Sequence, residues 1–334
     1  MHPKYTSILQ LHKEDKILKG ISLFDYSQEG ALVPLYDHVY ETCYNHLQTK
    51  VNKTDLSEVV LAYDLEDDPT GTARPSLNAI TLSRNIIRYL YDLYWMAEEV
   101  LTKNGSKNIQ LAFKRRSLAI DEALIAEIAE FQYYHELGHL LQDNINPKAN
   151  INSRSQDQPG DIPYLQAREI DADWMAADQL AQRIVNSFLD KGLSIDELEG
   201  DISIALTAVS CFFIRAIKHE TLQYNQGNYP DPIIRIEIFR HNIFAMIKCY
   251  LPSGNTFNEQ SVVDDASNFI RGMFANELTE EGLFPNTADE VKAEIIDNKT
   301  KIEEYISKLT AKSQEISENC SNGKAISIGL SKYQ

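Results

Sequence analysis

The sequence predicts a mainly α-helical fold of the α+β class, with one small β-sheet beside a central helix. Apolar residues recur at helical spacing through most of the chain, which indicates a series of amphipathic or buried helices. Only residues 59–63 and 76–82 have the β-branched or alternating character of strands. The chain has 334 residues, 43% of them hydrophobic, and is therefore long enough to bury a sizeable core.

Three regions follow from this pattern: an N-terminal helical region over residues 1–55, a core over 56–250 and a C-terminal helical region over 251–334. The first region contains an amphipathic helix near 32–49. In the core, the two predicted strands are separated by an acidic stretch, 64–75, which contains glycine and proline and is expected to form a loop.

Five helices are expected in the core, followed by further helices in the C-terminal region. Apolar periodicity places the core helices at residues 83–101, 117–143, 164–189, 202–219 and 233–251. Residues 109–113 alternate apolar and polar side chains and are predicted to be extended. In the C-terminal region, residues 269–274 and the charged amphipathic stretch 288–318 are expected to be helical, and the last dozen residues to be frayed.

Charge excludes one broad class of protein. The formal net charge is −17 at pH 7 and the pI is about 4.9. Residues 114–116 are the only locally basic stretch, whereas a nucleic-acid-binding domain normally carries a basic patch or stripe. We therefore expect no nucleic-acid partner.

The cysteines and apolar runs indicate a cytoplasmic protein. The four cysteines, Cys43, Cys211, Cys249 and Cys320, are scattered and form no C-x-x-C pair, which suits a reducing compartment. The first ten residues are polar and lack the apolar run of a signal peptide. The longest apolar run, 202–217, is shorter than the roughly twenty residues that span a bilayer. We expect no contact with a membrane.

The segment 131–142 contains the motif His-Glu-Leu-Gly-His within the helix predicted at 117–143. Residues four apart lie on one face of a helix, so His135 and His139 can bind the same metal ion. Glu136 lies beside them, where its carboxylate can hold and deprotonate a metal-bound water. The motif therefore predicts a zinc hydrolase.

A catalytic zinc site usually has three protein ligands, and the next helix offers the third in Glu169. Asp173 follows one turn later, where it can accept the second ring N–H of a ligand histidine. Ala172 and Ala176 are small, which suits close packing of the two helices. The alternatives are a purely structural zinc site, or a buried helix with two hydrogen-bonded histidines and a salt-bridged Glu136.

Together the two elements resemble the gluzincin metallopeptidases, in the branch whose third ligand lies in an E-x-x-A-D helix. That branch includes the CAAX prenyl endopeptidases, the soluble ImmA-like peptidases of mobile elements and the phage-exclusion peptidase Lit. The resemblance spans about residues 76–245 and is specific at His135, Glu136, His139, Glu169, Ala172 and Asp173. It implies a zincin-like core, one Zn²⁺ per chain, and Glu136 as the general base.

Two weaker similarities concern the substrate. Residues 78–83 resemble the strand that lines the cleft in this branch and pairs with the substrate backbone, which implies substrate-binding roles for Asn78, Ala79 and Ile80. The polar loop predicted at 144–163 separates the two halves of the site and is expected to contact the substrate as well.

Residues 228–236 resemble the downstream His-Pro…Arg segment of the prenyl endopeptidases, with Tyr229 in place of the histidine. The Tyr229 phenol either donates a hydrogen bond to an oxyanion or packs at the entry to a helix. Arg235 either orients the substrate or forms a structural ion pair.

These observations predict a soluble zinc endopeptidase that cleaves a cytoplasmic protein, in phage defence or in the regulation of a mobile element. One alternative is a repressor-cleaving peptidase of the ImmA type. Another is a non-catalytic interaction module that keeps zinc for stability. The stretch 288–318 either receives a partner protein or packs on its own domain.

Overall fold

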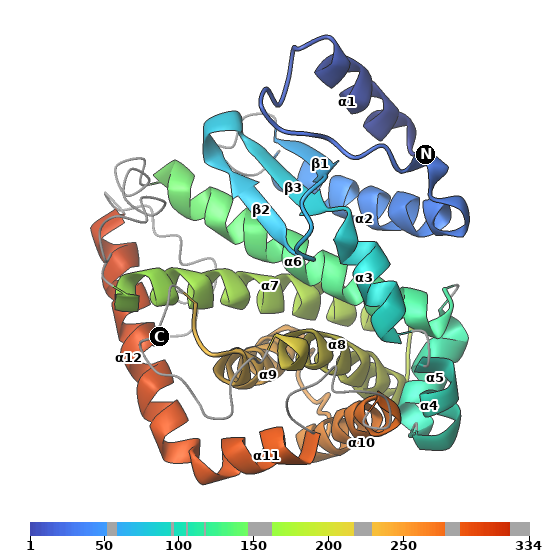
Figure 1. The fold of residues 1–334 in the computed structure, drawn as a ribbon. Coiled ribbons are helices and arrows are strands. Elements are labelled where there is room, and N and C mark those ends of the chain that lie inside the picture. Colours follow the sequence, from blue (N-terminus) through green and yellow to red (C-terminus); the bar gives the residue numbers. More distant parts are fainter. Residues whose placement is uncertain are drawn as a thin grey trace.

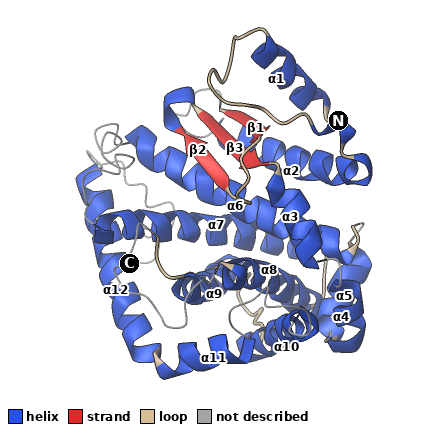
Figure 2. Cartoon of the chain, in the orientation of Figure 1, coloured by secondary structure: helices blue, strands red, loops and turns tan. Residues whose placement is uncertain are grey.

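The computed structural model describes residues 1–51, 59–94, 97–104, 106–116, 118–145, 162–216, 229–277 and 288–320. Within these ranges the chain is mostly helical with one three-stranded sheet, which confirms the expected mainly α architecture (Figures 1 and 2). Most of the predicted substrate loop (146–161) and the last dozen residues of the chain lie outside the described residues.

The N-terminal region packs beside the sheet and contains α1 (Pro3–Lys13), the short 3-10 helices η1 (Tyr26–Gln28) and η2 (Gly30–Leu32), and α2 (Val33–Val51). The α2 helix confirms the prediction at 32–49. The Tyr5 ring stacks on that of Tyr26, and its hydroxyl donates a hydrogen bond to the carbonyl of Phe24 at 2.7 Å. This contact fastens α1 to the segment that leads to the sheet.

The sheet contains β1 (Val60–Asp64), β2 (Gly71–Arg74) and β3 (Ala79–Ser83), in the order β1-β3-β2. A short 3-10 helix, η3 (Pro75–Leu77), joins β2 to β3. Strand β3 is central, because it pairs parallel with β1 and antiparallel with β2. The predicted strands are confirmed, but the loop predicted at 64–75 is wrong in part because it contains β2. That strand has small and polar residues with no alternating apolar pattern, and it is held by β3 and a neighbouring helix.

The next helices are α3 (Asn85–Tyr94), α4 (Ala97–Asn104) and α5 (Lys107–Arg115). The first two together occupy the helix predicted at 83–101. The extended segment predicted at 109–113 is wrong, because these residues lie in α5. The Ser106 hydroxyl accepts a hydrogen bond from the Ile109 N–H and starts the helix, and Ile109, Ala112 and Phe113 are buried at helical spacing.

Four long helices form the middle of the molecule: α6 (Ile120–Ile145), α7 (Ile162–Lys191), α8 (Ile195–Arg215) and α9 (Pro232–Tyr250). They confirm the last four predicted core helices. Ser194 and Glu197 form a capping box at the start of α8, and Asp231 caps α9 ahead of Pro232. The α6 helix is buried on nearly every side, because the sheet, α2 and α3 cover it on one side and α7 and α8 on the other (Figure 1).

The C-terminal region contributes α10 (Glu259–Glu277), α11 (Ala288–Asp297) and α12 (Lys299–Cys320), so the predicted 288–318 helix is two helices. The α12 side chains Ile302, Tyr305 and Leu309 pack in a small apolar cluster with residues of α7 and α9. A larger core cluster includes side chains from all three predicted regions. None of the described helices is both long and apolar enough to cross a bilayer.

Gly200 marks a close contact between α5 and α8. A Cβ atom at this position in α8 would lie 2.2 Å from the backbone oxygen of Asn108 in α5. We expect Gly200→Ala to lower the free energy of unfolding by about 1–3 kcal/mol, because overpacking outweighs the better helix propensity of alanine. The exposed helical substitution Asn186→Ala is the control and should be neutral or slightly stabilising. Urea unfolding followed by circular dichroism measures both, and equal stability of the two variants would contradict the contact.

Candidate metal centre

Helices α6 and α7 approach most closely where Gly138 faces Ala172. A Cβ atom on Gly138 would lie 3.1 Å from Ala172 Cα and 3.3 Å from Ala172 Cβ. Ala172 and Ala176 are fully buried, as their small size predicts. The contact brings the N-terminal half of α7 against the C-terminal half of α6, where the histidine motif lies.

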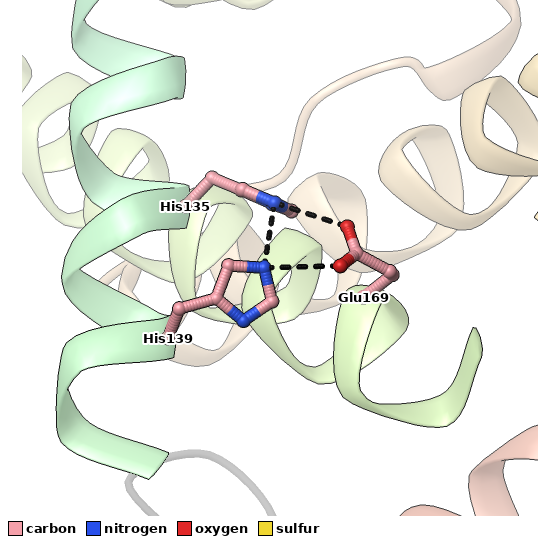
Figure 3. A group of neighbouring side chains, drawn as sticks. All are labelled: His135, His139 and Glu169. Carbon is pink, nitrogen blue, oxygen red and sulfur yellow. Dashed lines mark hydrogen bonds and ion pairs between the residues drawn. The ribbon is translucent and has the colours of Figure 1, made fainter. Parts of the chain in front are cut away.

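Three side chains converge beside this contact: His135 and His139 from α6, and Glu169 from α7 (Figure 3). The two Nε2 atoms are 3.1 Å apart. Glu169 Oε2 lies 3.3 Å from His135 Nε2, and Glu169 Oε1 lies 3.2 Å from His139 Nε2. A tetrahedral ion with bonds of about 2.0–2.1 Å holds its ligand atoms about 3.3 Å apart. The triad therefore has the spacing of three ligands to one metal ion.

The ring orientation of His135 is set from behind by Asp173, as predicted. His135 Nδ1 lies 2.9 Å from Asp173 Oδ1, and Asp173 is fully buried. Because the carboxylate only accepts, the proton of a neutral His135 is on Nδ1, and its Nε2 lone pair points into the triad.

Arg235 from α9 fixes Asp173 in turn. Its Nε and Nη2 atoms donate to the two carboxylate oxygens at 2.8 and 2.7 Å, and the guanidinium lies over the Phe213 ring at 4.5 Å. The predicted substrate-binding role of Arg235 is therefore corrected. Its Nε and Nη2 donors both bind Asp173, so Arg235 is a positioning residue that acts through Asp173. The ion-pair alternative stated for this residue is the one the geometry favours.

Gln142 contacts the second ring nitrogen of His139, as Asp173 does for His135. This role of Gln142 was not expected from the sequence. His139 Nδ1 lies 3.0 Å from Gln142 Oε1, and the Gln142 Nε2 atom donates to the Arg168 carbonyl and to Asp171. These two donations fix the amide orientation, so Oε1 faces the histidine. The available signal was position, because a residue three places after a helical histidine lies on the same face.

The electrostatics of the triad favour bound positive charge. Burial alone would lower the pKa of His135, but the carboxylates of Asp173 and Glu169 outweigh it and raise that pKa to about 10. Burial and Glu169 oppose each other in the same way at His139, whose pKa is also raised. The histidines hold the pKa of Glu169 well below its usual range despite burial.

The donor set also fits a metal ion chemically. Glu169 Oε2 is buried, and no group within the described residues donates a hydrogen bond to it. Two imidazole Nε2 atoms and a carboxylate are ligands that zinc accepts, and three protein ligands leave a coordination position open. His135, His139 and Glu169 could therefore hold a catalytic metal ion.

Glu136 lies on the sheet side of α6 and is tied to β2. Its Oε2 atom accepts a hydrogen bond from the Ala73 N–H at 2.6 Å, and the Gly71 N–H donates to Gln132 at 3.4 Å. A Cβ atom on Gly71 would lie 2.5 Å from Glu136 Cγ. The absence of a side chain at Gly71 therefore makes room for Glu136.

Strand β2, and not β3, turns its outer backbone edge to α6, where it contacts Glu136. In the antiparallel pair the Ser83 N–H donates to Thr70 O at 2.9 Å, so alternate residues of β2 face β3 and the amides of Gly71 and Ala73 face away. The predicted pairing of substrate with Ala79 and Ile80 is wrong, because β3 has a partner strand on both sides. Asn78 lies before β3 in a left-handed turn, φ 46°.

Tyr229 lies just ahead of α9, with its residue surface 62% exposed. Its carbonyl accepts a hydrogen bond from Gln166, three residues before Glu169. This exposure disfavours the alternative in which the ring packs on the core. The role of the phenol as an oxyanion donor stays a prediction.

Gln142→Met should weaken metal binding, because it removes the acceptor for His139 Nδ1–H while keeping the side-chain size. Loss of such a partner typically costs about 10–100-fold in metal affinity. Gln48→Met, on the exposed face of α2, is the matched control. Competition with a chromogenic chelator measures Zn²⁺ affinity, and an unchanged value for Gln142→Met would show that the amide does not orient His139.

Comparison of the chain with protein-family models, with curated proteins and with solved structures found no match. The functional interpretation therefore depends on the residues and distances of the centre itself.

Proposed function

We propose that the protein is a zinc-dependent endopeptidase of the gluzincin type. The observation that carries the proposal is the joint placement of a three-ligand triad and a separate glutamate, Glu136, next to it in the motif. A purely structural zinc site has four protein ligands and needs no neighbouring base. Here three potential ligands leave a position for water.

Zinc would lower the pKa of a water molecule to about 7 and polarise a peptide carbonyl. Glu136 is the residue suited to accept the proton from that water and to donate it to the leaving amine. Its Oε2 is held by the Ala73 amide at 2.6 Å, which fixes the carboxylate and leaves Oε1 for the water. Asp173 and Gln142 keep the two histidines in the ligand tautomer.

An extended peptide is the substrate class that suits β2. An outward-facing strand edge binds a peptide by backbone hydrogen bonds, which give affinity with little sequence dependence. The outward amides of Gly71 and Ala73 now donate to Gln132 and Glu136 of α6. A peptide that paired along this edge would replace these two contacts and would lie beside Glu136. Tyr229 remains the proposed donor to the oxyanion.

The proposed setting is the cytoplasm, with a protein substrate and with phage defence or mobile-element regulation as the biological role. The cytoplasmic setting and the biological role are proposed from the sequence resemblance and the composition alone. ImmA-type cleavage of a repressor is a narrower form of the same proposal, and no contact in the structure distinguishes the two. The retained Glu136 beside the triad disfavours a non-catalytic module.

Glu136→Gln tests the reaction. The amide cannot take a proton from water, so we expect loss of proteolysis by at least about 100-fold, at the lower end of typical general-base contributions. Zn²⁺ content should stay near one per chain because Glu136 is not a ligand. New protein termini are counted after incubation of a cell lysate with each protein loaded with Zn²⁺.

Treatment with a chelator should abolish the same cleavages, and added Zn²⁺ should restore them. The exposed variant Glu41→Gln is the matched control. Cleavage that persists at the original rate in Glu136→Gln, with zinc still bound, would exclude the proposed mechanism.

Gly71→Ala tests the contact between strand and base. The added methyl would displace Glu136 without touching a ligand, so kcat should fall by about tenfold or more while Zn²⁺ affinity is unchanged, since small misplacements of catalytic groups are costly. Thr72→Ala, whose backbone faces β3, is the control. If Zn²⁺ affinity fell together with kcat, Gly71 would instead be needed to keep the candidate metal ligands in place.

A further inference from the structure

A cavity of about 710 Å³ lies away from the metal centre, between α8, α9, α10 and the α11–α12 pair. Its walls are mostly aliphatic and include Ile236, Ile238, Val263 and Ile270. Ile296 also borders it and is 62% exposed, an unusual position for isoleucine. The volume is within the range of pockets that enclose a small organic ligand.

Two hydrogen-bond donors among the lining residues lack an acceptor within the described chain. Asn242 is only 2% exposed, yet its Nδ2 atom has no partner. The buried Nε atom of Arg240 has none either, although its Nη2 atom is paired with Glu237. A buried donor without a partner destabilises the free protein. Both unmet groups are N–H donors, so the missing partner is an acceptor.

The charged side chains of the lining are largely balanced, because Arg240 pairs with Glu237 and Lys299 lies 3.9 Å from Glu303. The unmet donors therefore decide the chemistry of the head group. An apolar wall with unmet N–H donors, one of them on an arginine, suits a molecule with an aliphatic tail and an oxygen head that only accepts hydrogen bonds.

We propose that this cavity binds an alkyl carboxylate, a fatty-acid-like molecule, with its tail against the isoleucines and its carboxylate at Asn242 and Arg240. The site is separate from the proposed peptidase chemistry and does not depend on it. The two share helix α9, which supplies Arg235 to Asp173 and, one to two turns later, Arg240 and Asn242 to the cavity.

The test uses the full-length protein and two probes with the same tail, decanoate and decyltrimethylammonium, both below their micelle concentrations. Isothermal titration calorimetry should show saturable decanoate binding with one site per chain. The cationic probe should bind at least about tenfold more weakly, because it offers no acceptor. Comparable affinity for the two probes would overturn the assignment of the head group.

Two variants locate the site. Asn242→Leu keeps the side-chain volume and removes the donor, so decanoate affinity should fall about tenfold while the melting temperature of the free protein stays equal or rises. Val263→Trp should occupy part of the space for the tail and weaken decanoate binding. Asn45→Leu, on the exposed face of α2, is the control. Undetectable decanoate binding to the unaltered protein, or binding that both cavity variants retain in full, would overturn the proposal.

Discussion

The close contact between α6 and α7 is the constraint on which the centre depends. Gly138 and Ala172 let the two helices meet at a distance that larger side chains would prevent. Only at that distance does Glu169 lie 3.2–3.3 Å from the two histidine Nε2 atoms. Two of the candidate ligands come from one helix and the third from its neighbour, so their spacing is fixed by helix packing rather than by a loop.

Buried ion pairs extend this constraint from α6 and α7 to α9 and to Arg116, which follows α5. Arg235 links α9 to Asp173 of α7, and Asp173 holds His135 of α6. On the same α6 helix, Glu127 pairs with Arg116 and with Arg183 of α7. A buried charge is tolerated only when it is paired and hydrogen-bonded, and each of these groups has its partner. The network therefore keeps α6 and α7 in register around the centre.

The sheet contacts the motif helix α6 through β2, its shortest strand. Gly71 and Ala73 of β2 lie against α6, where they meet Glu136. A strand with bulky alternating residues could not come so near to the helix. The small residues of β2 allow it to lie close to α6. They also give the sequence no apolar alternation, which is why the strand is not recognised there.

The histidine motif, the E-x-x-A-D element and the order of the long helices could all be recognised in the amino-acid sequence. These are local features, because helical spacing alone places His135, His139 and Glu136 together. The sequence also identified Glu169 and Asp173, since both lie at helical spacing near the small residue Ala172.

Three features became evident only in the folded protein: which strand lies against Glu136, what Arg235 contacts, and the contact between Gln142 and His139. Strand order and side-chain partners depend on contacts between residues far apart in the chain, and a local pattern does not record them. The same applies to the cavity, whose walls come from several helices. Residues 109–113 show that a short pattern can also mislead within one element. Three alternating apolar positions are too few to distinguish a strand from the helix that Ser106 begins.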